Sequence, residues 1–290
     1  MNENHSEQAG RTTWILGDDG TSATLQAGAF LAGLWEDAVL PPTIHLVRAI
    51  DGSGDVDVQN EISPARQCLD AHGVAHQDHV VRMKAADAIL SIAHQHAASD
   101  IAVGGQGGAG SLFALGSVAY QVMHRSIIPL TVVREAAIDA DFKDGPANLQ
   151  RICLAMDGSA CALRALEHVT ASAKHRKSPL EIHLVNVQPP VISGLVKSFI
   201  SNDLILSYQL EQGAKALSGA KAFLDAAGLG YVTHVSVGTP AEAITAYALR
   251  QRCGRIVMGA RGMSIFGDIV LGSVSYKILH GATVPVTIVK

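Results

Sequence analysis

The sequence predicts an α/β fold built as two tandem, doubly wound, five-stranded parallel sheets of the Rossmann-like kind. Three observations support this prediction. Blocks of sequence recur in the same order in the two halves of the 290-residue chain, short apolar runs alternate with amphipathic segments, and each half carries a glycine-containing loop.

The internal repeat divides the chain into two domains. Similar blocks follow one another in the same order, which indicates a duplication. We expect a first domain at 11–137 and a second at 151–290, joined by a polar linker at 138–150. The second domain is longer, and its additional residues fall mostly within 189–228. The matched blocks are 19–21 with 157–159, 44–47 with 182–185, 116–120 with 272–276, and 128–133 with 284–289.

The second repeat alternates strand and helix signals. Short apolar runs rich in valine and isoleucine predict buried strands, and Leu163, Leu166 and Val169 have the spacing of an amphipathic helix. Such an alternation predicts a parallel sheet covered on both faces, with the loops after its first and fourth strands side by side at a ligand-binding crevice. The expected order is strand 151–156, helix 161–173, strand 180–187, helix 203–227, strand 231–237, helix 240–252, strand 255–258, helix 272–280 and strand 286–289.

Composition narrows the class of protein. Acidic residues outnumber basic ones and the formal net charge is −4, which argues against a protein that binds nucleic acid. No apolar stretch approaches the ~20 residues that a membrane-spanning helix needs. The four cysteines form no CxxC pair, which favours a reducing compartment, so we expect a cytoplasmic protein.

The glycine loop of the second repeat has residues suited to an anion. Gly259 and Gly262 permit positive φ angles and a close approach to the backbone. Gly272 and Ser273 open a helix whose free N–H groups and dipole favour a phosphate. The side chain of Arg261 could neutralise phosphate charge.

Two further residues complete the expected crevice. Asp157 follows the first strand, where it could accept hydrogen bonds from a ribose or a base, and Ser275 adds a hydroxyl donor. An aspartate opposite a set of free N–H groups suits a nucleotide. Two alternatives stay open: Asp157 could be a turn residue that bonds its own backbone, and the glycines could serve packing alone.

These motifs together resemble the universal stress protein family. The resemblance rests on Asp-Gly-Ser at 157–159, a Gly-x2-Gly-x9-Gly-Ser signature that starts at Gly259, and the apolar strand containing 284–286. It covers both halves, from about residue 11 to residue 290. It implies sheets of the universal stress protein type, paired across the two repeats as an internal pseudo-dimer, and leaves open whether two chains form a homodimer.

The resemblance also implies a ligand and a function, because in that family the signature marks the ATP-binding branch. ATP, with or without Mg²⁺, would lie in the second repeat, with Asp157 at the ribose and Val187 at the adenine. The protein would be a nucleotide-responsive stress regulator with at most slow ATP hydrolysis. The residues implied to hold phosphates are Gly259, Gly262, Gly272, Ser273, Val274 and Ser275, with Arg261 beside them.

Other functional classes stay open. A nucleotide-independent interaction or chaperone-like protein would carry the same repeats without a ligand. Residues 105–110 spell GxGxxG, which is typical of nicotinamide dinucleotide sites, but the homologous loop of the second repeat does not keep that spacing. The sequence contains no nucleophile elbow, HExxH or Walker motif, so a dedicated enzyme is not supported.

The first repeat departs from the signature. Its glycine loop is shorter, and Ala49 stands where the second repeat has Val187. We therefore expect nucleotide in the second repeat rather than in the first. Candidate contacts in the first repeat are Asp19, Gly104, Gly107, Gly116 and Ser117.

Histidines are frequent, and two groups of them lie close in sequence. A zinc site needs three or four converging ligands, whereas two residues at i and i+2 on a helix face apart. We therefore interpret both groups as solvated surface, and His45 and His183, inside predicted strands, as satisfied core or sheet-face residues. The groups are His72, His76 and His79, and His94 and His96.

Overall fold

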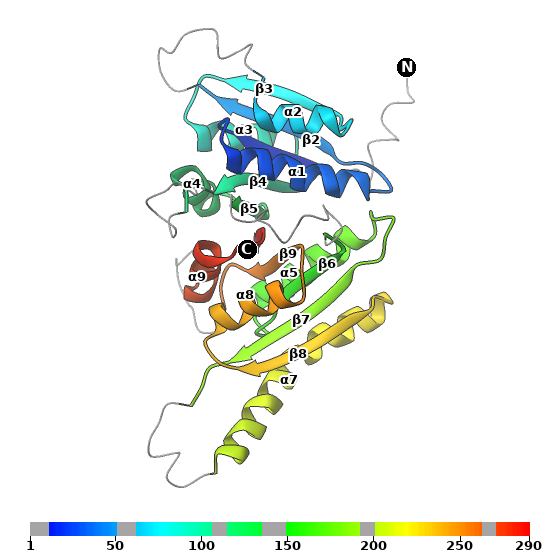
Figure 1. Cartoon of the computed structure of the whole chain (residues 1–290), viewed down its shortest axis with the longest axis vertical. Coiled ribbons are helices and arrows are strands. Elements are labelled where there is room, and N and C mark those ends of the chain that lie inside the picture. The colour runs from blue at the N-terminus through cyan, green and yellow to red at the C-terminus, as the bar shows by residue number, and fades with distance from the viewer. Residues whose placement is uncertain (1–11, 51–61, 106–114, 135–148, 192–200, 263–270) are drawn as a thin grey trace. The chain divides into compact units, whose positions relative to one another are not determined.

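A computed structural model describes residues 12–50, 62–105, 115–134, 149–191, 201–262 and 271–290 (Figure 1). The chain divides into two compact units. The first comprises Met1–Pro146 with His175–Ser178, and the second comprises Ala147–Lys174 with Pro179–Lys290. The linker predicted at 138–150 falls almost entirely outside the described residues.

The first unit is a parallel sheet with the strand order β3-β2-β1-β4-β5. The first strand of the repeat lies between the second and the fourth, so the chain winds outward in both directions from β1 (Figure 1). The strands are β1 (Thr13–Asp18), β2 (Thr43–Ala49), β3 (His76–Val81), β4 (Asp100–Gly105) and β5 (Leu130–Arg134). The helices are α1 (Ser22–Glu36), α2 (Pro64–Ala71), α3 (Ala85–Gln95) and α4 (Ser117–Arg125).

The second unit repeats this topology with the order β10-β9-β6-β7-β8. The predicted α/β class and tandem architecture are confirmed, and each predicted element of this repeat is present with ends that differ by a residue or two. The strands are β6 (Arg151–Ala155), β7 (Glu181–Gln188), β8 (Tyr231–Val237), β9 (Arg255–Gly259) and β10 (Val286–Val289). The helices are α5 (Ala160–Ala173), α7 (Asn202–Ala227), α8 (Pro240–Arg250) and α9 (Ser273–Gly281).

Helices α5 and α7 pack together over β6 and β7 and enclose a hydrophobic core. Local signals set their ends. Ser159 caps α5 by accepting a hydrogen bond from the N–H of Ala162, Ser201 caps α7 in the same way, and α7 ends at Gly228, which has a φ of 66°. The core residues include Ile152 and Leu154 on β6, Leu166 and Val169 on α5, and Leu217 and Leu224 on α7.

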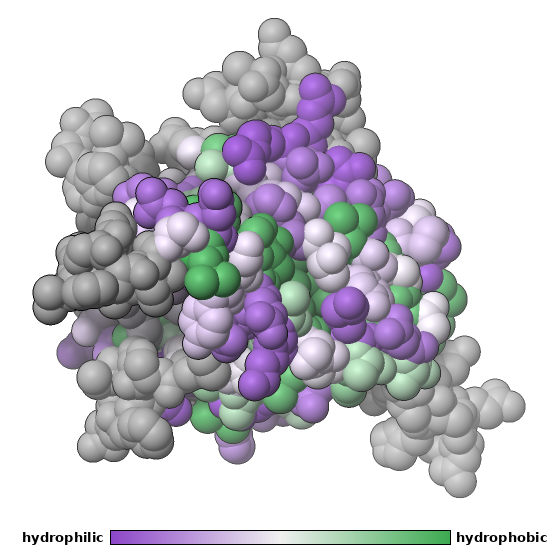
Figure 2. Space-filling view, turned by 90° about the horizontal axis from the view of Figure 1, so that it is seen from below, coloured by the Kyte–Doolittle hydropathy of each residue, from purple (hydrophilic) through white to green (hydrophobic). Residues whose placement is uncertain are grey.

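Within the described ranges, no helix combines the length and apolar character needed to cross a bilayer. This includes α7, the longest helix at 26 residues. The face of the molecule in Figure 2 carries hydrophilic residues interspersed with groups of hydrophobic ones.

Candidate functional site

A cavity of about 350 Å³ opens at the carboxyl ends of β6, β7 and β9. These strands meet at the point where strand order reverses, which is the usual ligand position in an open α/β sheet. The volume is that of a small-molecule pocket. All nine residues predicted for the second-repeat site line it: Asp157, Val187, Gly259, Arg261, Gly262, Gly272, Ser273, Val274 and Ser275.

Gly259, at the end of β9, is required by close packing. A Cβ atom there would lie 2.6 Å from the carbonyl carbon of Cys161 and 2.8 Å from the nitrogen of Ala162, in the first turn of α5. The close backbone approach that glycine permits is present here, whereas neither Gly259 nor Gly262 has a positive φ. Gly158, in the turn before α5, has a φ of 84° instead. The chain leaves β9 in an ordinary conformation, so space and not dihedral angle excludes a side chain.

Gly262 lies against the aspartate that follows β6. A Cβ atom at Gly262 would be 2.6 Å from Oδ2 of Asp157. The other carboxylate oxygen, Oδ1, accepts a hydrogen bond of 2.9 Å from the N–H of Ser159, so Asp157 does form the local turn that was the alternative interpretation. The Ser159 hydroxyl also donates to the carbonyl of Arg261 at 3.3 Å. The loops after the first and fourth strands therefore meet, with Asp157 between them and on the cavity wall.

The N-terminal end of α9 forms the opposite wall. Gly272 is its N-cap and provides no side-chain cap, and the first turn carries no acidic residue. The first N–H groups of a helix have no partner within it, so the backbone around Ser273 and Val274 presents donors towards the cavity. Ser275 is buried, and its hydroxyl donates to the carbonyl of Gly259 at 3.0 Å, which ties α9 to the loop.

Positive charge gathers beside this wall. Burial, together with the nearby charge of Arg261, lowers the pKa of Lys290 from its usual value. Sequence reasoning missed Lys290. The parallel pairing of β10 with β9 could have indicated this residue. Val289 aligns with Gly259 and its carbonyl accepts a hydrogen bond of 2.7 Å from Ala260, so the next residue, Lys290, follows beside the loop after β9. Of these two cations, Arg261 lines the cavity.

The far side of the cavity is mainly apolar. Val187 lies there beside Met156, Pro189 and Ile244. The side chain of Asn186 is held in place, because its Nδ2 donates to the carbonyl of Met156 at 2.7 Å. Of these residues sequence reasoning identified only Val187. Met156, Asn186 and Pro189 lie at or beside predicted strand ends, Ile244 lies in a predicted helix, and no motif singles them out.

The equivalent position in the first repeat contains an ion pair. Asp18 and Arg48, which correspond to Met156 and Asn186 in the repeat, lie with Nη2 and Oδ2 3.0 Å apart. The Asp18 side chain is 1% exposed and that of Arg48 is 14% exposed. A charged pair therefore stands where the second repeat has a methionine and an asparagine on the cavity wall.

The first-repeat candidates are used mainly in local structure. Oδ1 of Asp19 accepts hydrogen bonds from the N–H and hydroxyl of Thr21, at 3.0 and 2.6 Å, and from the hydroxyl of Thr24 at 2.6 Å. A Cβ atom at Gly104 would lie 2.9 Å from the nitrogen of Thr24, the same packing as at Gly259. Gly116 and Ser117 start α4. Gly107 and most of 105–110 lie outside the described residues.

Comparison with known proteins decides the family. The model of the universal stress protein family matches residues 22–134 and again residues 148–290. The chain belongs to the universal stress protein family. The two matches follow the two repeats, so this is a tandem universal stress protein.

Individual relatives agree with this assignment. Universal stress protein MJ0531 of Methanocaldococcus jannaschii is 29% identical over 57% of this chain and 96% of its own length. Universal stress protein YxiE of Bacillus subtilis is 32% identical over 48% of this chain and 98% of its own length. A solved universal stress protein from Archaeoglobus fulgidus superposes over 96% of this chain and 98% of its own, with a TM-score of 0.65 and 22% identity.

Proposed function

We propose that this universal stress protein binds ATP, with or without Mg²⁺, in its second repeat and acts as a nucleotide-responsive stress regulator. The observation that carries the proposal is the convergence of the nine residues predicted for the site on one cavity at the carboxyl ends of β6 and β9. The alternative in which those glycines serve packing alone accounts for Gly259 but does not require a cavity of this size beside them.

The chemistry of the walls favours a nucleotide orientation. The uncapped end of α9 and the Arg261–Lys290 pair provide donors and positive charge for a polyphosphate. The carboxylate of Asp157 would accept hydrogen bonds from ribose hydroxyls, and the apolar side around Val187 and Met156 suits an adenine ring. Gly259, Gly262, Gly272, Ser273, Val274 and Ser275 would surround the phosphates.

Hydrolysis, location and assembly extend the proposal. The cavity wall includes no histidine and no carboxylate besides Asp157 in the described part of the chain, which supports at most slow ATP turnover. We propose a cytoplasmic location. The domain limits of 11–137 and 151–290, the pseudo-dimer and the homodimer stay predictions.

The decisive experiment is ATP binding by the full-length protein and by Gly262→Val. Calorimetry of the wild type should give one ATP site per chain, and acid extraction of purified protein should release adenine nucleotide. The variant should lose this binding with an unchanged circular dichroism spectrum, because its side chain would occupy the space beside Oδ2 of Asp157. Binding by neither protein, and no thermal shift with ATP and Mg²⁺, would favour the nucleotide-independent interaction or chaperone-like alternative.

A matched control separates the repeats. Ser117→Val and Ser273→Val change equivalent positions at the starts of α4 and α9. Only Ser273→Val should weaken ATP binding. Equal weakening in both variants would contradict the assignment to the second repeat.

A further inference from the structure

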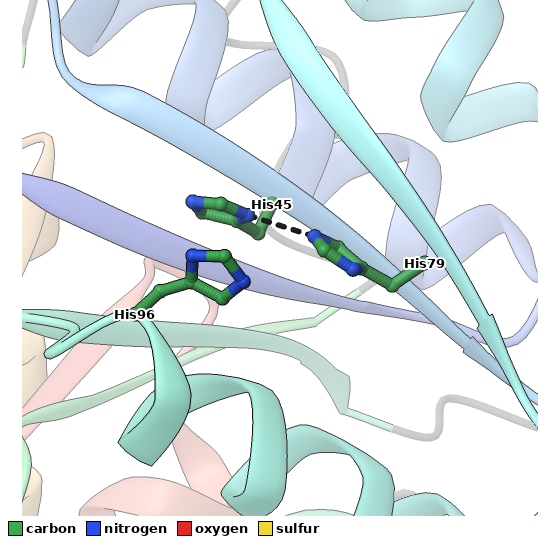
Figure 3. Close-up of side chains that lie close together, drawn as sticks. All are labelled: His45, His79 and His96. Carbon is green, nitrogen blue, oxygen red and sulfur yellow. Dashed lines mark hydrogen bonds between the residues drawn. The ribbon is translucent and has the colours of Figure 1, made fainter.

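The first repeat brings together three imidazole rings that are distant in sequence. His45 lies on β2, His79 on β3, and His96 is the C-cap residue of α3. Figure 3 shows the three rings gathered in one group, with His45 and His79 linked by a hydrogen bond. One nitrogen from each ring lies within 4.8 Å of the other two. The interpretation of His79 and His96 as solvated surface is therefore wrong.

Strand register explains the convergence. In the parallel pairing of β2 with β3, Val47 aligns with His79. His45 is two residues before Val47, and side chains two apart on a strand share a face, so His45 and His79 point to the same side of the sheet. Helix α3 packs on β2, and its end brings His96 onto that pair. The ring centroids of His45 and His96 are 4.0 Å apart.

Hydrogen bonding within the group is incomplete. Nδ1 of His45 and Nε2 of His79 share a hydrogen bond of 2.8 Å, which satisfies one nitrogen on each of these two rings. Nε2 of His96 is buried and has no hydrogen-bond partner among the described residues. A buried nitrogen without a partner costs free energy unless something else binds it. A metal ion is one such partner for an imidazole that lies beside two others.

We propose that His45, His79 and His96 form a binding site for a divalent transition-metal ion, with Zn²⁺ as the expected occupant. Zinc accepts three histidine ligands at about 2.0–2.1 Å and keeps its fourth position for water. In such a tetrahedron the ligand nitrogens are about 3.4 Å apart. The separations in this group run from the 2.8 Å hydrogen bond up to a limit of 4.8 Å. Small side-chain rotations would complete the geometry once the proton shared by His45 and His79 has moved to the other nitrogen of its ring or to solvent.

The donor set selects the class of metal. All three ligands are imidazole nitrogens, which suit Zn²⁺ and its transition-metal neighbours, whereas Mg²⁺ and Ca²⁺ prefer oxygen ligands. The site therefore differs in chemistry from a Mg²⁺ site beside nucleotide phosphates. It also does not involve the residues of the second-repeat cavity, so its test is independent of the proposed function.

The second repeat contains a natural control for this site. His183 and His234 occupy the equivalent positions on β7 and β8, where Val185 aligns with His234. His183 is bonded to the Tyr247 hydroxyl at 2.8 Å and to Oε1 of Glu181 at 2.9 Å, while the His234 ring stacks on Tyr247 with centroids 4.4 Å apart. Within the ranges that the structure describes, the first-repeat trio is the only group of three potential ligand residues that meets this geometry.

The test is a zinc titration of the full-length, metal-stripped protein without nucleotide, using a competing chromophoric chelator. The wild type should bind one Zn²⁺ per chain at this site and show a higher Tm with zinc. His79→Ala and His96→Ala should each weaken that affinity by at least about tenfold, since even indirect contacts to a metal are worth that much. The double control His183→Ala with His234→Ala should keep the wild-type affinity.

Cobalt substitution gives a second, geometric measurement. Co²⁺ in the wild type should give the intense visible bands of a four-coordinate ion, and His96→Ala should lose them. His96 caps a helix end and does not lie in the sheet, so this variant tests the site even if His45→Ala fails to fold. The proposal is overturned if His79→Ala and His96→Ala bind zinc as the wild type does, or if the control weakens binding equally.

Discussion

The two repeats share one topology but differ where their chemistry would lie. At the crevice, the second repeat has Met156 and Asn186 on the wall of a cavity, and the first has the Asp18–Arg48 ion pair. Over β2 and β3, and over β7 and β8, the difference is reversed, because the first repeat gathers three histidines while His183 of the second is satisfied by a tyrosine and a glutamate. Duplication has kept the packing and allowed the polar positions to diverge. The two proposals together assign a different ligand to each repeat.

The largest effect is expected from copying the ion pair into the second repeat. Met156→Asp with Asn186→Arg should lower ATP affinity by about 100-fold, because a charged pair would replace two uncharged residues of the wall and narrow the cavity. Calorimetry with ATP measures this effect, and circular dichroism checks the fold. Affinity within about twofold of the wild type would show that the ion pair does not block a nucleotide.

The ion pair itself should stabilise the first repeat only while both partners are present. Asp18→Asn should lower the free energy of unfolding by about 2 kcal/mol, since Arg48 is mostly buried and would lose the opposite charge of Asp18. Asp18→Met with Arg48→Asn should cost less than about 1 kcal/mol, because both charges are removed. Urea denaturation provides both values. A double variant less stable than Asp18→Asn would contradict this account.

Lys290, which lies near Arg261 of the cavity wall, sharpens the comparison. Lys290→Met should weaken ATP binding by about three- to tenfold and reduce its dependence on salt, because one of two adjacent cations is removed. The fluorescence of a labelled ATP analogue at several salt concentrations would measure this. An unchanged salt dependence would place the phosphates away from this residue.

The smallest expected effect is the pH response of His234 in the second repeat. Burial, and secondarily the charge of Arg250, lower the pKa of His234 below its ordinary value. As the pH falls below about 6.5, His234 takes up a proton in the unfolded chain before it does so in the folded protein. The stability that comes from neutral His234 is therefore present above about pH 6.5 and is lost as the pH falls towards the folded-state pKa. His234→Gln should flatten the fall in Tm between pH 7 and pH 5 by about a degree or two. A variant with the same pH dependence as the wild type would rule out this contribution.

Much of the candidate site could be predicted from local patterns. Asp157 and the loop from Gly259 to Ser275 were recognised from short motifs, and the alternation of strands and helices placed them at the ends of neighbouring strands. Gly259 shows the limit of that reasoning. The need for a glycine was evident, but its cause, contact with Cys161 and Ala162, depends on how closely α5 approaches β9.

The sequence by itself determined the tandem repeat, the order of the elements and the crevice at which the signature residues meet. These follow from periodicity, turn chemistry and duplication, which are local or repeated features. Only the tertiary structure decided that Asp18 pairs with Arg48 and that His45, His79 and His96 converge. Such contacts depend on the register between neighbouring strands and on where a helix ends over the sheet. The spacing of residues along the chain does not encode which side chains face one another in that arrangement.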